Sequence, residues 1–158
     1  MTKFSPDILK IDLPAESERI AEFIKKTVIG RMHKKGAVVG LSGGIDSAVS
    51  AALSVKAFGP EKVTVAIDVD QNGKMPSGYE VYIDGGRTAT GADAIEWAKK
   101  VDGYGVPVIL PTSKATDGAR TGYDLEIIRK IAAATSAEVV ASGGAGKPEH
   151  FREAAEAG

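Results

Sequence analysis

Short apolar stretches that each lead through a glycine-containing loop into a helical stretch are the feature that most limits how this chain can fold. Residues 37–41 (AVVGL) run into Ser42-Gly43-Gly44 and an apolar helical segment over 48–58, and a second strand-like stretch, 63–70 (VTVAIDVD), follows at once. The order strand, helix, strand with almost continuously apolar strands is typical of a parallel sheet covered by helices. The chain is therefore predicted to be an α/β protein.

The same order returns in the second half of the chain. There the apolar spacing predicts helices and strands in alternation, namely a helix over 91–101, a strand over 107–113, a helix over 124–134, a strand over 138–142 and a helix over 148–157. Residues 71–90 interrupt the order and are interpreted as an inserted β-hairpin. With an amphipathic N-terminal helix over 13–29, the prediction is a single α/β domain over residues 1–158, built on a mainly parallel four-stranded sheet.

Four βα units can be arranged in two ways. In a doubly wound, Rossmann- or flavodoxin-like sheet, helices cover both faces and ligands bind where the strand order reverses. In a half-barrel-like sheet the strand order follows the sequence and one face stays uncovered. We favour the doubly wound form, because the helix over 13–29 offers a cover for the second face. The half-barrel-like form is the alternative, and a homodimer is compatible with it.

Composition excludes several classes of function. Twenty basic and 21 acidic residues give a net charge of −1, which argues against nucleic-acid binding. The chain has no cysteine and two histidines, so we expect no metal site. The opening residues MTKFSPDILK contain no apolar h-region, and no run of about 18 apolar residues occurs. We therefore expect a cytoplasmic protein that is not associated with a membrane.

The first glycine loop, SGGIDS, combines groups that suit a bound phosphate. Adjacent Gly43 and Gly44 let the backbone approach a ligand closely, and free N–H groups at a helix start attract anions. The hydroxyls of Ser42 and Ser47 add donors. Asp46 fits as a helix cap, or as a group that orders the loop and a divalent cation. An ordinary strand-to-helix turn is the alternative interpretation.

This loop and its surroundings, GAVVGLSGGIDSAVSAALSVKAFGPEKV, resemble the NAD synthetases of the ATP pyrophosphatase superfamily. The resemblance covers residues 1–63. It implies a PP-loop that holds the phosphates of ATP with magnesium present, with binding carried by Ser42, Gly43, Gly44, Asp46 and Ser47. One function that follows is that of an ATP-dependent adenylating enzyme.

The rear of the chain carries three further motifs, VAIDVD, PTSKATDGARTGYD and ASGGAGKPEHF. With them, residues 63–158 resemble the C-terminal half of the cyclase subunit of imidazole glycerol phosphate synthase, a (βα)8-barrel enzyme. The resemblance implies that Asp68 occupies the position of a catalytic acid at the end of a strand. It also implies that Gly118 and Gly144, with Gly143 beside them, contribute backbone N–H groups to a phosphate site.

Other polar residues near these motifs have simpler interpretations. Asp117 is expected to form a turn and Asp124 to cap a helix. His150 is expected at the surface, and Trp97 is expected to pack against the sheet or an interface.

Two incomplete resemblances that meet near Val63 favour an engineered or recombined chimera of segments 1–63 and 64–158. The corresponding functional hypothesis is a scaffold without complete catalytic machinery, in which Asp68 is inactive. Such a scaffold would at most bind phosphate or a nucleotide at its glycine loops and would require no cofactor. An NAD synthetase-like enzyme that uses ATP and magnesium is the alternative. A natural relative that runs continuously through Lys62 to Ala66 would overturn the chimera hypothesis.

Overall fold

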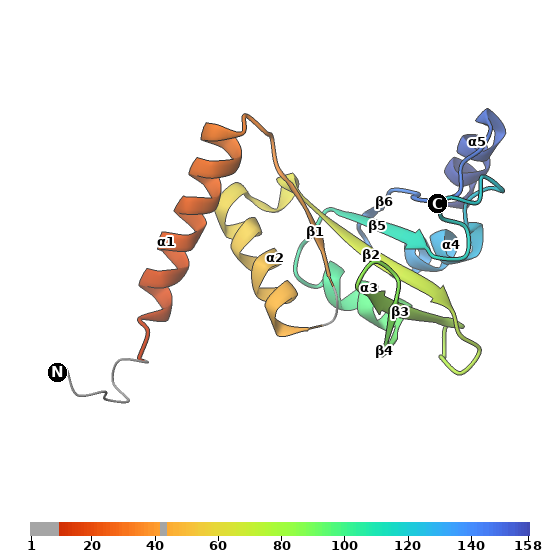
Figure 1. The fold of residues 1–158 in the computed structure, drawn as a ribbon, viewed down its shortest axis with the longest axis horizontal. Coiled ribbons are helices and arrows are strands. Elements are labelled where there is room, and N and C mark those ends of the chain that lie inside the picture. Colours follow the sequence, from red (N-terminus) through yellow and green to blue (C-terminus); the bar gives the residue numbers. More distant parts are fainter. Residues whose placement is uncertain (1–9, 42–43) are drawn as a thin grey trace.

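The computed structural model describes residues 10–41 and 44–158 (Figure 1). Along the chain it contains α1 (Leu13–Lys25), a π-helical turn η2 (Lys26–Arg31), β1 (Ala37–Gly40), α2 (Ile45–Phe58), a 3-10 turn η3 (Pro60–Lys62), β2 (Val63–Gln71), β3 (Tyr79–Ile83), β4 (Thr88–Asp93), α3 (Ala94–Asp102), β5 (Val108–Ser113), α4 (Leu125–Ala134), β6 (Glu138–Val139) and α5 (Pro148–Ala157). The predicted α/β class, the N-terminal helix and the inserted hairpin, which is formed by β3 and β4, are confirmed. None of the described helices is both long and apolar enough to cross a membrane.

β2 is the central strand of the sheet. Along one edge it pairs in parallel with β5, which pairs in parallel with β6. Its other edge is shared: β1 pairs in parallel with residues 63–66 of β2, and β3 pairs antiparallel with residues 68–71 and continues to β4. The parallel strands therefore lie in the order β1-β2-β5-β6, which is also their order in the chain.

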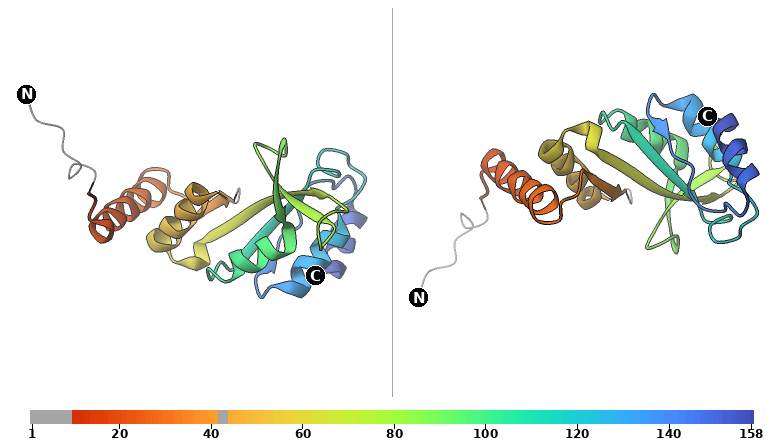
Figure 2. Two further views of the ribbon diagram at one scale, coloured as in Figure 1. Left: turned by 90° about the horizontal axis from the view of Figure 1, so that it is seen from below. Right: turned by 90° about the horizontal axis from the view of Figure 1, so that it is seen from above.

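This strand order differs from the doubly wound arrangement that we favoured. A doubly wound sheet needs a reversal of strand order. Here each new parallel strand is added on the same side of the one before it, so the order never reverses. Right-handed crossovers then place α2, α3 and α4 on one face of the sheet (Figure 2). Burial along β2 agrees, since Val65, Ile67 and Val69 are buried while Thr64 and Ala66 are half-buried. The sheet thus corresponds to the half-barrel-like alternative.

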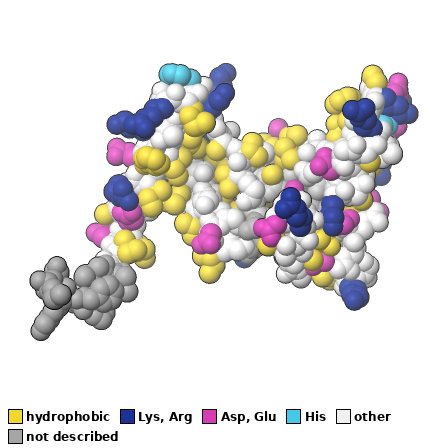
Figure 3. Space-filling model, in the orientation of Figure 1, with side chains coloured by type: hydrophobic (Ala, Val, Ile, Leu, Met, Phe, Trp, Pro, Cys, Tyr) yellow, Lys and Arg dark blue, Asp and Glu magenta, His cyan; other side chains and the backbone are white. Residues whose placement is uncertain are grey.

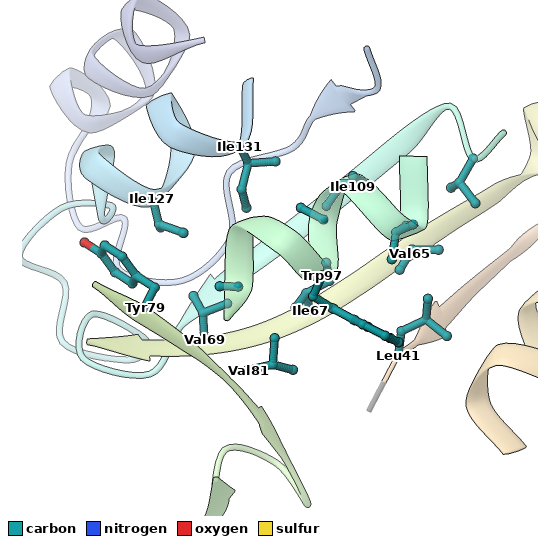
Figure 4. Packing of buried hydrophobic residues seen from close by; sticks show 14 of the residues in the cluster. Leu41, Val65, Ile67, Val69, Tyr79, Val81, Trp97, Ile109, Ile127 and Ile131 are labelled. Atoms are coloured by element: carbon teal, nitrogen blue, oxygen red, sulfur yellow. The ribbon is translucent and has the colours of Figure 1, made fainter. Parts of the chain in front are cut away.

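The main core lies between the buried face of the sheet and the helices that cover it (Figure 4). It contains, among others, Leu41, Val65, Ile67, Val69, Val81, Trp97, Ile109, Ile127 and Ile131. The β-branched residues of the strands meet the isoleucines of α4, and burying each such side chain contributes about 1.5–3 kcal/mol to stability. Trp97 is 7% exposed, so the prediction that it packs against the sheet is confirmed.

The N-terminal helix α1 does not cover the second face of the sheet, as we had expected. It begins after Asp12, whose carboxylate accepts a hydrogen bond from the Ala15 N–H at 3.1 Å. It then packs along α2, where Ala21 joins a second cluster with Phe58 and Val63 (Figure 1). Because α1 packs its apolar side against α2 and not against the sheet, the residues of β2 that point away from the helices stay half-buried.

Candidate functional site

A row of polar side chains crosses β2 and β5 near their carboxyl ends and continues to the segment that follows β6. Asp68 of β2 lies opposite Thr112 of β5 in the parallel register. Thr112 forms an isolated parallel β-bridge with Ser142 through the backbone. In addition, the Thr112 Oγ1 donates a hydrogen bond to the Ser142 Oγ at 3.0 Å. All three residues are half-buried on the face that the helices leave open. We call Asp68, Thr112 and Ser142 the strand-end row.

Two loops that follow the strand-end row pack against each other. The Gly122 N–H donates to the Gly144 carbonyl at 2.8 Å, and a Cβ atom on Gly143 would come within 3.1 Å of the Asp117 carboxylate. Gly118, Gly143 and Gly144 have φ values of +73°, +79° and +99°, a backbone region that favours glycine. The structure therefore brings the glycines expected to bind phosphate to the end of the sheet that carries Asp68.

The carboxyl group of Asp68 has an environment that suits proton transfer. Partial burial, and then the negative charge of Asp117, raise the pKa of Asp68 above its ordinary value. A carboxyl group with a raised pKa at the end of a parallel strand can both hold and release a proton nearer neutral pH.

The raised pKa of Asp68 predicts how its replacement changes stability. Because the folded protein holds this proton more tightly than the unfolded chain, ionisation of Asp68 lowers stability as the pH rises through the unfolded and then the folded pKa. We therefore expect Asp68→Asn to melt at a higher temperature than the unmodified protein at neutral pH. The difference should vanish in acid, where Asp68 of the unmodified protein is protonated in both the folded and the unfolded state.

Thermal unfolding over a pH series measures this difference. In addition, Asp117→Asn should lower the pKa of Asp68 in a carboxyl NMR titration, because it removes the neighbouring charge. An Asp68→Asn variant that is less stable than the parent at neutral pH would contradict the assignment.

The first glycine loop lies apart from this site. Ser42 and Gly43 fall outside the described residues. Gly44 precedes α2 with φ −82°, an ordinary extended conformation, and no side chain of the described residues is seen to cap the helix. The cap expected of Asp46 is therefore not observed, and the Ser47 hydroxyl donates to the Gly44 carbonyl at 2.9 Å. Since β2 and β5 separate β1 from β6, β1 and the start of α2, including Gly44, lie apart from the rear glycine loops.

His150 corrects a further expectation, because it is buried rather than at the surface. It is 5% exposed, and its Nδ1 accepts a hydrogen bond from the Gly146 N–H at 3.0 Å. Its ring lies against Gly122, where an added Cβ would be 3.6 Å from Nε2. His150 therefore connects the start of α5 with the loop that contains Gly122 and the loop that contains Gly146.

Sequence reasoning missed Thr112 and Ser142 as members of the site. Their signal was present, since Thr112 lies within the PTSKATDG motif and Ser142 precedes Gly143. However, these positions can be recognised as part of the site only when the strand register is known, because the register places Thr112 beside Asp68. Over residues 10–41 and 44–158, no group of three or more His, Asp or Glu side chains is placed to hold a metal ion.

Lys114 holds the inserted hairpin against the end of β5. Its Nζ lies 3.5 Å from the Asp70 carboxylate and 4.5 Å from the centre of the Tyr82 ring. These contacts join the loop after β5 to β2 and β3, beside the strand-end row.

Comparison with known proteins points to one family. A family model described as "Histidine biosynthesis protein" matches residues 38–158. The imidazole glycerol phosphate synthase subunit HisF of Pyrobaculum aerophilum is 51% identical over 107 residues, which are 68% of this chain and 41% of that protein. The subunit of the same name from Solidesulfovibrio magneticus is 47% identical over 109 residues, 67% of this chain and 42% of that protein. The chain thus spans about two fifths of the length of these curated relatives.

These matches correct the functional hypotheses. The matched range, 38–158, extends across Val63, and the relatives carry the name of an enzyme subunit. The hypothesis of a designed scaffold is therefore wrong, and so is the NAD synthetase-like alternative. The phosphate-binding roles of Gly44, Asp46 and Ser47, and the expectation that no cofactor is required, stay predictions.

Proposed function

Since the chain belongs to the histidine biosynthesis protein family, whose model covers residues 38–158, we propose that its strand-end row and the adjoining glycine loops act in the reaction for which its relatives are named. The ligand of this site is a phosphate ester of the imidazole glycerol phosphate class. The observation that carries the proposal is the placement of Asp68, Thr112 and Ser142 in one row beside three glycines with free backbone donors.

The phosphate end of the ligand binds at Gly118, Gly143 and Gly144. In the described chain the N–H groups of these glycines donate no hydrogen bond to another protein group. Backbone donors that converge in turns with positive φ form concave anion sites, and a phosphate group supplies the acceptors that these N–H groups lack.

The reacting end of the ligand lies over the strand-end row in this proposal. Asp68 serves as the group that exchanges a proton with the ligand, which its raised pKa favours. The hydroxyls of Thr112 and Ser142 lie next along the row and offer hydrogen bonds to ligand hydroxyls. The relatives are named as subunits, and the chain spans about two fifths of their length. Turnover therefore requires further protein in this proposal.

Binding of imidazole glycerol phosphate, measured by calorimetry, tests the site. We expect Gly118→Ala to weaken binding roughly tenfold, the equivalent of one charge-assisted hydrogen bond. Gly91→Ala is the matched control, because Gly91 in β4 has a similar φ of +77° and, like Gly118, open space around a new Cβ. Both changes should cost about 1 kcal/mol of stability.

Two results would contradict the proposal. One is equal affinity of the Gly118→Ala and Gly91→Ala variants for imidazole glycerol phosphate. The other is equal affinity of the unmodified protein for imidazole glycerol phosphate and for the same molecule without its phosphate group.

A further inference from the structure

An apolar cavity lies between α2 and α3, on the helical side of the sheet and away from the strand-end row. Its volume is about 540 Å³, which is within the usual range of ligand pockets. Ala48, Ala51 and Ala52 form the wall on α2, and Trp97 and Val106 lie opposite. The small alanine side chains leave the space that larger residues of α2 would fill.

The polar side chains of this cavity are all hydrogen-bond donors or hydroxyls, and none is a carboxylate. They belong to Trp97, Lys100 and Tyr104. The Trp97 ring reaches from α3 toward Leu41 (Figure 4), and its buried Nε1–H has no partner among the described residues. The Lys100 ammonium lies 5.0 Å from the centre of that ring, and within the described ranges it forms no ion pair with a carboxylate. The cavity therefore offers a positive charge at Lys100 that no carboxylate of its lining neutralises.

The mouth of the cavity exposes large apolar side chains to water. Ile45 is 82% exposed, Val49 49% and Tyr104 47%, and hydrophobic side chains gather at this end of α2 in Figure 3. Covering such surface contributes about 25 cal/mol per Å² of apolar area. A ligand with an apolar body gains this energy, and a hydrophilic anion such as free phosphate does not.

From the apolar walls and the unmatched cation we propose that this cavity binds an amphipathic carboxylate. Its hydrocarbon body lies among Ala48, Ala52 and Trp97, and its carboxylate faces Lys100. An organic cation is disfavoured because Lys100 repels it, and a neutral hydrocarbon forms no ion pair with Lys100.

Octanoate tests this proposal, with 1-octanol as its uncharged counterpart. Trp97 is the only tryptophan in the chain, so intrinsic fluorescence reports directly on the cavity wall. We expect octanoate to change the Trp97 emission in a saturable manner. Octanol should bind roughly fivefold more weakly, as expected for the loss of a partly exposed ion pair.

Three substitutions test where the ligands bind and whether Lys100 causes the preference for octanoate over octanol. Lys100→Gln should give octanoate and octanol the same affinity. Lys99→Gln is the matched control, because the Lys99 Nζ bonds to Glu96 at 2.8 Å and lies outside the cavity lining; it should keep the preference. Ala52→Leu should abolish binding of both ligands by filling the space, and because Ala52 is exposed, the folded state should tolerate the larger side chain.

Three outcomes would overturn the proposal. The first is an unchanged Trp97 emission at millimolar octanoate. The second is equal affinity of the unmodified protein for octanoate and octanol. The third is a Lys100→Gln variant that retains the preference for octanoate.

Discussion

Replacement of Gly144 by alanine is expected to lower the free energy of unfolding by about 4 kcal/mol. A Cβ atom at this position would overlap the Gly122 carbonyl oxygen and lie 2.9 Å from the Thr116 Cβ. The backbone φ of +99° adds strain of about 1–3 kcal/mol for a residue with a side chain, and forcing extra volume into a packed site costs a similar amount. The midpoint and slope of urea unfolding measure the loss.

Gly91→Ala separates the two causes of this loss. Gly91 has a φ of +77° but no atom within 4 Å of an added Cβ, so only the backbone strain of about 1 kcal/mol is expected there. Gly144→Ala should therefore be much less stable than Gly91→Ala. Equal losses in the two variants would show that the loops at Gly122 and Gly144 are not packed as the structure describes.

Replacement of Asp124 by alanine is expected to have an effect of similar size, about 4 kcal/mol. Asp124 caps α4 by accepting from the Ile127 N–H at 3.4 Å, and it also accepts from the Tyr79 hydroxyl at 2.9 Å and the Ser113 hydroxyl at 3.0 Å. Tyr79 and Ser113 are each 2% exposed. Loss of a cap costs about 1 kcal/mol, and each buried hydroxyl left without its partner adds about 1–3 kcal/mol.

Asp12→Ala is the matched control for Asp124→Ala. Asp12 caps α1 through one exposed hydrogen bond to the Ala15 N–H, so its replacement should cost about 1 kcal/mol or less. Burial and then the bond to Asp124 raise the pKa of Tyr79, which keeps its hydroxyl protonated and donating. A double-mutant cycle with Tyr79→Phe should therefore show a coupling of about 1–2 kcal/mol with Asp124. If Asp124→Ala costs no more than Asp12→Ala, the buried network does not stabilise the fold.

Residues that act through local geometry were predictable from the sequence. Asp124 was predicted as a helix cap, and it is one, because capping depends only on a side chain and the N–H groups two or three residues ahead. The hairpin around Tyr79 to Ile83 was predicted for the same kind of reason, since turn residues and alternating side chains act over a few positions.

Predictions that required knowledge of distant contacts failed. His150 was expected at the surface from its place in the first helical turn, but it is buried against Gly122. The doubly wound sheet was favoured because α1 offered a cover, yet α1 packs on α2. In both cases the local pattern allows either outcome, and the free energy of burying a side chain against a remote segment decides between them.

The amino-acid sequence by itself determined the type and order of the helices and strands, the position of Asp68 at a strand end and the glycines of the rear loops. Periodicity, caps and turn residues are local properties, so they can be interpreted without coordinates. The tertiary structure alone decided the strand order, the open face of the sheet, the row formed by Asp68, Thr112 and Ser142, and the cavity beside Trp97. These depend on strand register and on which side chains fill the space between helices, and both arise from contacts between residues far apart in the chain.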